Sequence, residues 1–308
     1  MTAQLLVSAL LFAMAAWVYI DELYTNKAIQ LALNARQPSP PKPNYIFPAG
    51  GRKIFPNHRI VALYGSPNAP VLGALGRNTA DKSAMAVKRL AEQYQPYSKE
   101  KILPTFEIIA TVASEFPTEN NDYSRAVSHK TLQEWITAAR KAGVYVVLDI
   151  QSGRTDFLTQ AKELAPLLKQ PNVGLALDPE WRLKSHQIPL VQIGHVSIDE
   201  VNRVAGWLAA FTHHNRLPQK LFLLHQFRND MLPNRDKLVT THRELAYAIQ
   251  MDGQGTQSQK QDTWRAILRN APHNTKFGWK NFYTKDTTLL TPKQTMLISP
   301  KPWYVSYQ

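Results

Sequence analysis

Acidic side chains occur in this sequence directly after short apolar runs, which is where catalytic side chains lie in many α/β barrels. Asp178 and Glu180 follow the run Val173-Gly-Leu-Ala-Leu177, and Asp149 lies near the end of the preceding run. Because side chains alternate along a strand, Asp178 and Glu180 are predicted to share one face, with Asp149 one strand away. Carboxyls this close cannot all ionise at neutral pH, so one is expected to keep a proton while another stays charged.

Two carboxyls in opposite protonation states are what cleavage of a glycosidic bond requires. We therefore assign Glu180 as the proton donor and Asp178, expected to be better hydrogen-bonded and ionised, as nucleophile or charge stabiliser. Polar and aromatic side chains at the ends of other runs are predicted to bind a polysaccharide or wall glycan: Tyr64, Asp149, Gln151, Trp181, His225, Gln226, Gln250, Asp252 and Lys280. Trp279 and Trp303 are further candidates for stacking on sugars. No cofactor and no metal are predicted.

Structural roles are the alternative for these acids, which could cap turns or pair with Arg154, Arg182 or Lys280. Glu107 stands apart inside an earlier apolar run and is expected to lie in a barrel interior, paired with a base. A metal-dependent hydrolase built on Asp178, His225 and Asp252 is a second alternative, although no local spacing such as His-x-His supports it. A catalytically inert glycan-binding protein of the cell envelope is the third.

The elements that position these residues alternate between strand-like and helix-like segments. Runs rich in β-branched and aromatic residues predict eight strands, at residues 59–64, 105–113, 144–150, 173–178, 220–225, 245–251, 276–280 and 303–307. Helix start signals fall between them, at Thr79, Ser128, Thr155, the capping box Ser197–Glu200 and Thr291. Eight strand–helix units in about 250 residues indicate the α/β class and a single (β/α)8 TIM barrel. An open doubly wound sheet is the main rival.

The N-terminal region differs from the rest of the 308-residue chain. Residues 3–20 are almost continuously apolar, so residues 1–22 are predicted to be a signal peptide or a membrane-anchoring helix. Residues 37–44 read Gln-Pro-Ser-Pro-Pro-Lys-Pro-Asn, an extended spacer within a linker over residues 23–57. The barrel is assigned to residues 58–308. We expect an extracytoplasmic protein, anchored by its N-terminal helix or secreted after cleavage, with no other membrane contact.

Composition narrows the classes of function. The absence of cysteine excludes disulfides, thiolate metal sites and a cysteine nucleophile. The net charge of +13 is spread over single and paired basic residues with no RNA-reading aromatic signature, so no nucleic-acid partner is predicted.

Residues 182–196 form a long insertion after the fourth run, which is either a lid over the site or a surface excursion. We expect a monomer.

Blocks spread over the whole barrel resemble a family of exported actinobacterial proteins that carries no established activity. They are Val61-Ala-Leu-Tyr-Gly-Ser-Pro67, Leu148-Asp-Ile-Gln-Ser-Gly-Arg154, Leu175-Ala-Leu-Asp-Pro-Glu-Trp-Arg182, Leu224-His-Gln-Phe227, Asp252-Gly-Gln-Gly255, Gly278-Trp-Lys-Asn-Phe282 and Tyr304-Val-Ser-Tyr-Gln308. This resemblance implies export and a shared site, but no reaction. The Asp-x-Glu at the fourth strand is also similar to that of chitinases and barrel-type muramidases, with Glu180 in the place of the acid. The chain departs from the chitinase pattern at Val173 and Ala176, where that pattern has two further acids.

Overall fold

A computed structural model describes residues 45–47 and 50–308 of the chain. The predicted apolar segment and the proline-rich stretch lie outside the described residues. Among the described residues, no helix has the length and apolar character needed to cross a membrane.

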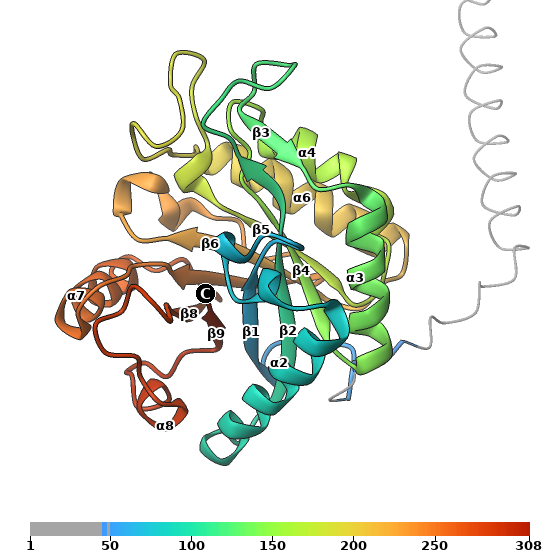
Figure 1. Cartoon of the computed structure of the whole chain (residues 1–308), viewed down its shortest axis with the longest axis vertical. Coiled ribbons are helices and arrows are strands. Elements are labelled where there is room, and N and C mark those ends of the chain that lie inside the picture. Colours follow the sequence, from blue (N-terminus) through green and yellow to red (C-terminus); the bar gives the residue numbers. More distant parts are fainter. Residues whose placement is uncertain (1–44, 48–49) are drawn as a thin grey trace, which may run out of the picture. The chain divides into compact units, whose positions relative to one another are not determined.

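Eight parallel strands close into a barrel, as the sequence predicts (Figure 1). The barrel closes because β1 pairs with β2 on one side and with the last strand, β9, on the other. The strands are β1 (His58–Gly65), β2 (Lys101–Ala113), β4 (Tyr145–Ile150), β5 (Val173–Leu177), β6 (Lys220–Gln226), β7 (Leu245–Met251), β8 (Lys276–Asn281) and β9 (Tyr304–Tyr307). A short ninth strand, β3 (Ser124–Ala126), pairs antiparallel with the end of β2.

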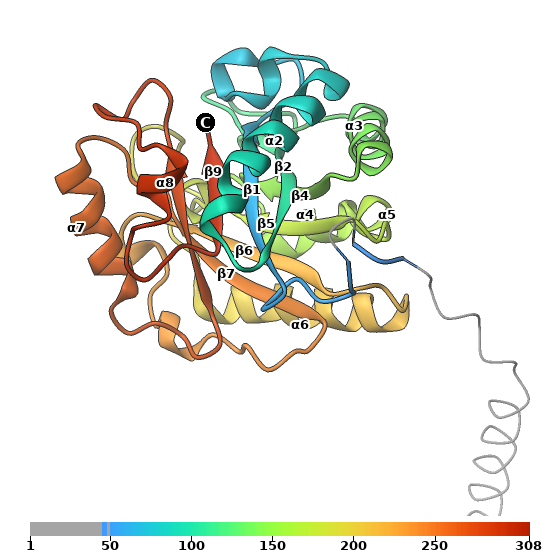
Figure 2. The ribbon, with the colours of Figure 1, turned by 90° about the horizontal axis from the view of Figure 1, so that it is seen from below.

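Helices surround this barrel on its outer side (Figure 2). They are α2 (Ala80–Tyr94), α3 (His129–Ala142), α4 (Phe157–Glu163), α5 (Ala165–Leu168), α6 (Ile198–His214), α7 (Gln257–Leu268) and α8 (Pro292–Thr295). Side-chain caps begin α2, α3, α6 and α8 at the predicted residues, whereas α4 is capped by Asp156 in place of Thr155. Between β6 and β7 the chain makes two 3-10 turns, η5 (Asn229–Met231) and η6 (Arg235–Lys237), in place of an α-helix.

The predicted capping box of α6 is only half formed. Ser197 accepts a hydrogen bond from the backbone N–H of Glu200, as a cap does. The Glu200 carboxylate, however, turns away and accepts hydrogen bonds from the N–H of Phe157 and from the Arg182 guanidinium, both at 2.9 Å. A charged partner holds a carboxylate more strongly than one backbone N–H does, so the ion pair prevails. It ties α4, α6 and the segment after β5 together.

Strand alternation divides the apolar side chains into two cores. Leu148 and Leu177 belong to the core between the strands and the helices. Val147 and Ala176, one residue away in each strand, belong to the core inside the barrel. The same alternation turns Asp149 inward, so a polar layer lies above the inner apolar core.

Residues ahead of His58 complete the inner core at the amino-terminal end of the strands. Phe47 and Ile54 are almost fully buried there, and the side chain of Gln219 accepts a hydrogen bond of 2.9 Å from the Ile54 N–H. The compact unit of the structure accordingly begins at Tyr45. The boundary drawn at His58 from the sequence thus leaves out residues that close this end, because a short irregular segment has no periodicity to reveal its burial.

Candidate functional site at the carboxyl ends of the barrel strands

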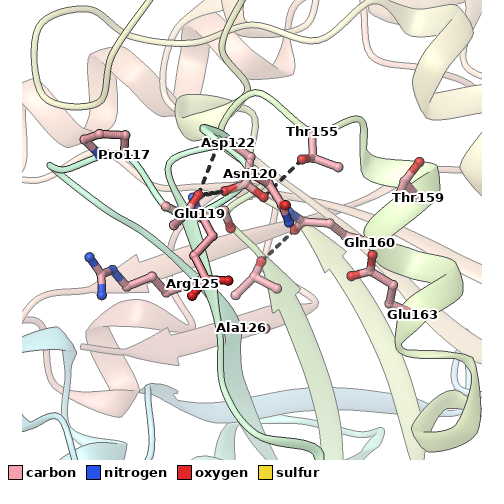
Figure 3. A pocket seen from close by; sticks show the side chains of 13 residues that line it. Pro117, Glu119, Asn120, Asp122, Arg125, Ala126, Thr155, Thr159, Gln160 and Glu163 are labelled. Carbon is pink, nitrogen blue, oxygen red and sulfur yellow. Dashed lines mark hydrogen bonds between the residues drawn. The ribbon is translucent and has the colours of Figure 1, made fainter.

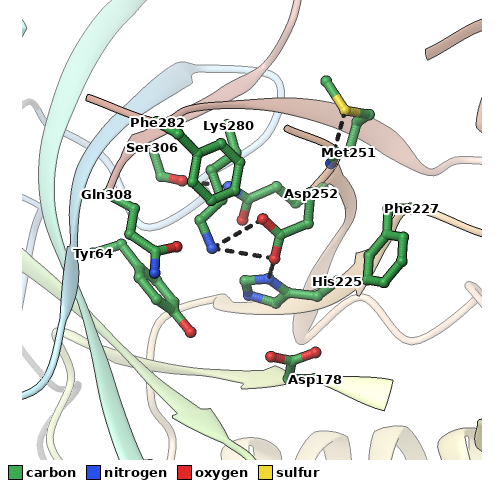
Figure 4. A network of polar contacts seen from close by, with 12 residues as sticks. Tyr64, Asp178, His225, Phe227, Met251, Asp252, Lys280, Phe282, Ser306 and Gln308 are labelled. Atoms are coloured by element: carbon green, nitrogen blue, oxygen red, sulfur yellow. Dashed lines mark hydrogen bonds and ion pairs between the residues drawn. The ribbon is translucent and has the colours of Figure 1, made fainter. Parts of the chain in front are cut away.

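Polar side chains from several strands meet at the carboxyl ends of the strands, which we call the mouth. Register and alternation bring Tyr64 of β1, Asp149 of β4, His225 of β6 and Lys280 of β8 into the barrel interior, and Asp252 follows β7. Figure 4 shows Tyr64, His225, Asp252 and Lys280. All five are buried or nearly so. The structure therefore brings together residues that are up to 216 positions apart, since Tyr64 lies under Lys280, whose Nζ is 3.6 Å from the centre of the Tyr64 ring.

His225 is held by two carboxylates from opposite sides. Its Nε2 lies 2.7 Å from Glu107 Oε1, and its Nδ1 lies 2.7 Å from Asp252 Oδ2. Glu107 also accepts a hydrogen bond of 2.9 Å from the Tyr304 hydroxyl, and Lys280 Nζ lies 3.0 Å from Asp252 Oδ1. Both ring nitrogens of His225 must donate to satisfy these contacts, so the ring is an imidazolium. The prediction that Glu107 is an interior residue paired with a base is thus met.

These contacts fix the charges of the network. Burial alone lowers the pKa of His225, but the nearby Asp149 and Glu107 carboxylates outweigh it and raise this pKa well above its usual value. Burial works to raise the pKa of Asp252, yet Lys280 and His225 hold it below its usual range. The pKa of Lys280 is raised, because Asp252 and Glu107 more than offset its burial. Glu107, Asp252, His225 and Lys280 form a quartet of two carboxylates and two cations.

Three further carboxyls at the mouth make no hydrogen bond to a cation among the described residues, although His225 Nε2 lies 3.9 Å from Asp149 Oδ1. Burial raises the pKa of Asp149 to about 6, although His225 opposes this. Burial likewise raises the pKa of Asp178 well above its usual value. The pKa of Glu180 is raised to about 7, first by burial and then by the negative charge of Asp252. Five carboxyls thus share two buried cations, and the three that are left over keep protons more readily.

Asp178 differs from its predicted state. It was expected to be well hydrogen-bonded and ionised, but it caps the 3-10 turn η4 (Pro179–Trp181) and accepts a long hydrogen bond of 3.3 Å from the Glu180 N–H. One weak bond does not offset the burial of the charge, so the ionised form is disfavoured. The carboxylate that stays charged at the mouth is Asp252, which draws two cations from neighbouring strands. The predicted partners Arg154 and Arg182 contact backbone carbonyls and Glu200 instead.

A cavity of about 450 Å³ opens above this network, within the range of small-ligand sites. We call it the mouth cavity. Seven of the predicted site residues line it: Tyr64, Gln151, Asp178, Glu180, Trp181, Asp252 and Lys280. Asp149, His225 and Gln250 do not line the cavity and belong to the buried polar layer. Gln250 donates a hydrogen bond to Ser306 there.

Gln226 is not part of the site. Because it follows His225 on the same strand, alternation turns it out of the barrel, where it contacts Arg235 and the carbonyl of Arg228. Trp279 is likewise turned outward and packs on Trp264. Trp303 lies at the amino-terminal end of β9, stacked against Arg59. Of the predicted aromatic residues, Tyr64 and Trp181 are the two that line the mouth cavity.

Several residues of the site were missed by sequence reasoning. Phe227, Phe282, Lys285 and Gln308 line the mouth cavity, and the Tyr304 hydroxyl lies beneath it. Gln308 and Tyr304 share the inward face of β9 by alternation, which is a signal the sequence does contain. Phe227, Phe282 and Lys285 lie in or beside loops, where no period indicates direction.

The residues of the metal alternative are arranged differently from a metal centre. His225 has both ring nitrogens bonded to carboxylates, so neither offers a lone pair to an ion. Over residues 45–47 and 50–308, no group of three or more His, Asp or Glu side chains has a geometry that could hold a metal ion.

A larger hollow of about 810 Å³ lies elsewhere, between the β2–β3 connection and α4 (Figure 3). We call it the outer hollow. None of the predicted site residues lines it. Its central acid, Asp122, is occupied by local contacts, since it accepts hydrogen bonds from Thr118, Thr155 and the N–H of Ser124. The mouth cavity, where carboxyls with raised pKa values meet aromatic walls, is the better candidate.

No protein-family model matches the chain, and no curated protein matches its sequence. Among solved structures the chain is similar to the xylanase and α-amylase inhibitor protein XAIP-II from Scadoxus multiflorus, at 13% identity and a TM-score of 0.46, covering 81% of this chain and 92% of that one. It is similar to a GH113 β-1,4-mannanase at 10% identity and a TM-score of 0.43, covering 81% and 86%. A hyperthermophilic endo-β-1,4-glucanase follows at 8% identity and 0.39, covering 80% and 87%. Likeness at this level says nothing about the reaction.

Proposed function

We propose that the barrel is a glycoside hydrolase whose proton donor is Glu180. The observation that carries this proposal is that two carboxyls line one cavity in surroundings that shift their pKa values in opposite directions. The pKa of Glu180 is raised to about 7, while the pKa of Asp252 is held below its usual range. A protonated acid beside a fixed negative charge is the pairing that glycosidic cleavage uses.

The excess of carboxyls over bases supports the same reaction. Cleavage of a glycosidic bond passes through a transition state with positive charge on the sugar ring. Three carboxyls that make no hydrogen bond to a cation, Asp149, Asp178 and Glu180, favour the development of such a charge, because positive charge nearby stabilises their ionised forms. In this proposal Asp178 first loses its proton to solvent in the mouth cavity that it lines; Glu180 then protonates the leaving oxygen, and the ionised Asp178 acts as nucleophile or charge stabiliser. Asp252 supplies a fixed charge.

The substrate we propose is a polysaccharide of the cell envelope or the environment. The mouth cavity offers rings and hydrogen-bonding groups together, from Tyr64, Trp181 and Gln151. Apolar ring faces pack against the C–H faces of sugars while polar groups bind their hydroxyls.

The apolar run at residues 3–20 supports a location outside the cytoplasm. Residues 1–44 fused to alkaline phosphatase would then give activity; an inactive fusion would refute export.

The test is an assay of the full-length protein on chito-, cello- and manno-oligosaccharides and on purified peptidoglycan glycan strands. New reducing ends, released by the parent protein, are the expected result. Binding of an oligosaccharide in calorimetry without any new reducing end would instead indicate an inert glycan-binding protein. Turnover that disappears with a chelator and returns with a divalent ion would indicate a metal-dependent hydrolase.

A further inference from the structure

A second hollow of about 470 Å³ adjoins the mouth cavity. Glu180, Trp181 and Leu190 line both, so the two hollows lie side by side and share these three side chains as walls. The far wall of the second hollow is formed by Val191 and Ile193 of the connection between β5 and α6. The side chain assigned as the proton donor therefore has a hollow on each side of it.

The connection that forms this wall, residues 182–196, is fixed at its base. The N–H of Gly194 donates to the carbonyl of Glu180 at 2.6 Å, and the N–H of His195 donates to the carbonyl of Arg182 at 3.1 Å. A side chain at position 194 would collide with the backbone, since its Cβ would lie 2.6 Å from the Glu180 carbonyl oxygen. The wall of the second hollow is thus built directly on the backbone that carries Glu180.

The tip of the same connection exposes apolar side chains. Leu190 and Val191 are 72% and 70% exposed, although both line the hollow. Exposed apolar side chains that line a hollow beside polar groups are typical of a binding surface. A molecule bound in the second hollow would contact Glu180 and Trp181, which also line the mouth cavity.

From this geometry we infer that the glycan runs through both hollows and is cleaved internally, with sugar residues bound on both sides of Glu180. This inference rests on the proposed glycoside hydrolase function. An enzyme that removes residues from a chain end needs binding space closed on one side of the acid. Here a hollow lies on each side of Glu180, so the substrate class we infer is a polymer, and the insertion after β5 forms one half of its binding groove.

The experiment uses the full-length protein on soluble carboxymethyl cellulose, glycol chitin and galactomannan. For the polymer that is cleaved, viscosity is expected to fall well before reducing ends accumulate, with products of mixed length at early times. Val191→Trp, which fills the second hollow, is expected to lower kcat/KM on that polymer by about tenfold. Val239→Trp is the matched control, because Val239 is also an exposed valine but lines neither hollow, and it is expected to act like the parent.

Thermal unfolding of both variants separates loss of folding from loss of binding. Release of only mono- or disaccharides from the start, with unchanged viscosity and with Val191→Trp equal to Val239→Trp, would overturn internal cleavage while leaving the hydrolase proposal intact. If the parent cleaves no polymer and no oligosaccharide, the proposed function fails, and internal cleavage fails with it.

Discussion

The two ends of the barrel interior hold opposite kinds of side chain. At the amino-terminal end, Phe47, Ile54 and Leu221 pack into a largely apolar core. At the mouth, buried carboxyls and cations replace them, and three of the carboxyls have raised pKa values. Full burial of one large apolar side chain stabilises a fold by about 1.5–3 kcal/mol, whereas burial of a charge costs stability unless it is paired.

This contrast indicates that the two ends serve different purposes. The amino-terminal end stabilises the fold by burying apolar side chains. The mouth lowers the stability, because it buries carboxyls whose pKa values are raised above those they have in water. Substitutions at the amino-terminal end are therefore expected to change the free energy of unfolding without changing the rate of the reaction. Substitutions at the mouth are expected to divide into those that change the reaction and those that weaken the network beneath it.

The largest effect is expected from Glu180→Gln. The amide keeps the shape of the acid but delivers no proton, so cleavage of a substrate with a poor leaving group should fall by about 10²–10⁴-fold. A substrate with an activated aryl leaving group should lose much less, and oligosaccharide binding should persist. Rates of hydrolysis on both substrates, with binding by calorimetry, measure this. Glu163→Gln in the outer hollow is the control, and it should leave the hydrolysis rates and the oligosaccharide binding unchanged.

Asp178→Asn separates the roles of the two carboxyls within the same experiment. Loss of the counter-charge should slow both substrates, by about 10²-fold. If Glu180→Gln and Asp178→Asn both cleave like the parent, the pair is structural and the hydrolase proposal is wrong.

The pH dependence of both rate and stability should report Glu180. Turnover of the poor leaving group should fall as the pH rises through about 7, where Glu180 loses its proton. Because the pKa of Glu180 in the folded state lies above its ordinary value of 4.5, its contribution to stability is complete below pH 4.5 and is lost as the pH rises through about 7. Denaturant unfolding should show the parent losing free energy of unfolding relative to Glu180→Gln as the pH rises from 4.5 through about 7. A difference that stays constant over this range would contradict the raised pKa.

Phe47→Ala tests the opposite end. Removal of this buried ring is expected to lower the free energy of unfolding by about 3–5 kcal/mol, while the activity per folded molecule stays that of the parent. Its neighbour Ile46 is 60% exposed, so Ile46→Ala should change stability by less than about 0.5 kcal/mol. Chemical denaturation measures both. Equal stabilities of the two variants would show that residues 45–57 do not close the barrel.

The smallest effect distinguishes two buried tyrosines. Tyr304→Phe removes the hydroxyl that donates to Glu107, and should cost about 1–3 kcal/mol of stability because a buried carboxylate loses a partner. Tyr247 is also buried, but its hydroxyl has no hydrogen-bond partner among the described residues. Tyr247→Phe should therefore be neutral or slightly stabilising. Denaturation midpoints that shift equally for the two variants would refute a specific role for the Tyr304–Glu107 bond.

The sequence by itself determined the barrel. Strand runs and helix caps are local signals, and they favoured a (β/α)8 barrel over the rival open sheet. All eight strands form within a few residues of their predicted positions, and the pairing of β1 with β9 closes the barrel. Alternation also separates inward from outward residues where a strand is regular. It places the side chains of Asp149 and Val147 inside the barrel. Applied strictly, it also excludes Gln226 from the site, because Gln226 follows the inward His225.

Only the tertiary structure decided the chemical state of each acid. His225 meets Glu107 across 118 positions of sequence, and Asp252 stays ionised because Lys280 and His225 come to it from neighbouring strands. Asp178 receives no such partner, so burial raises its pKa. A pKa depends on burial and on the sum of charges around a group in space. The order of residues along a chain contains neither quantity, so sequence spacing identified the carboxyls but not which of them holds the charge.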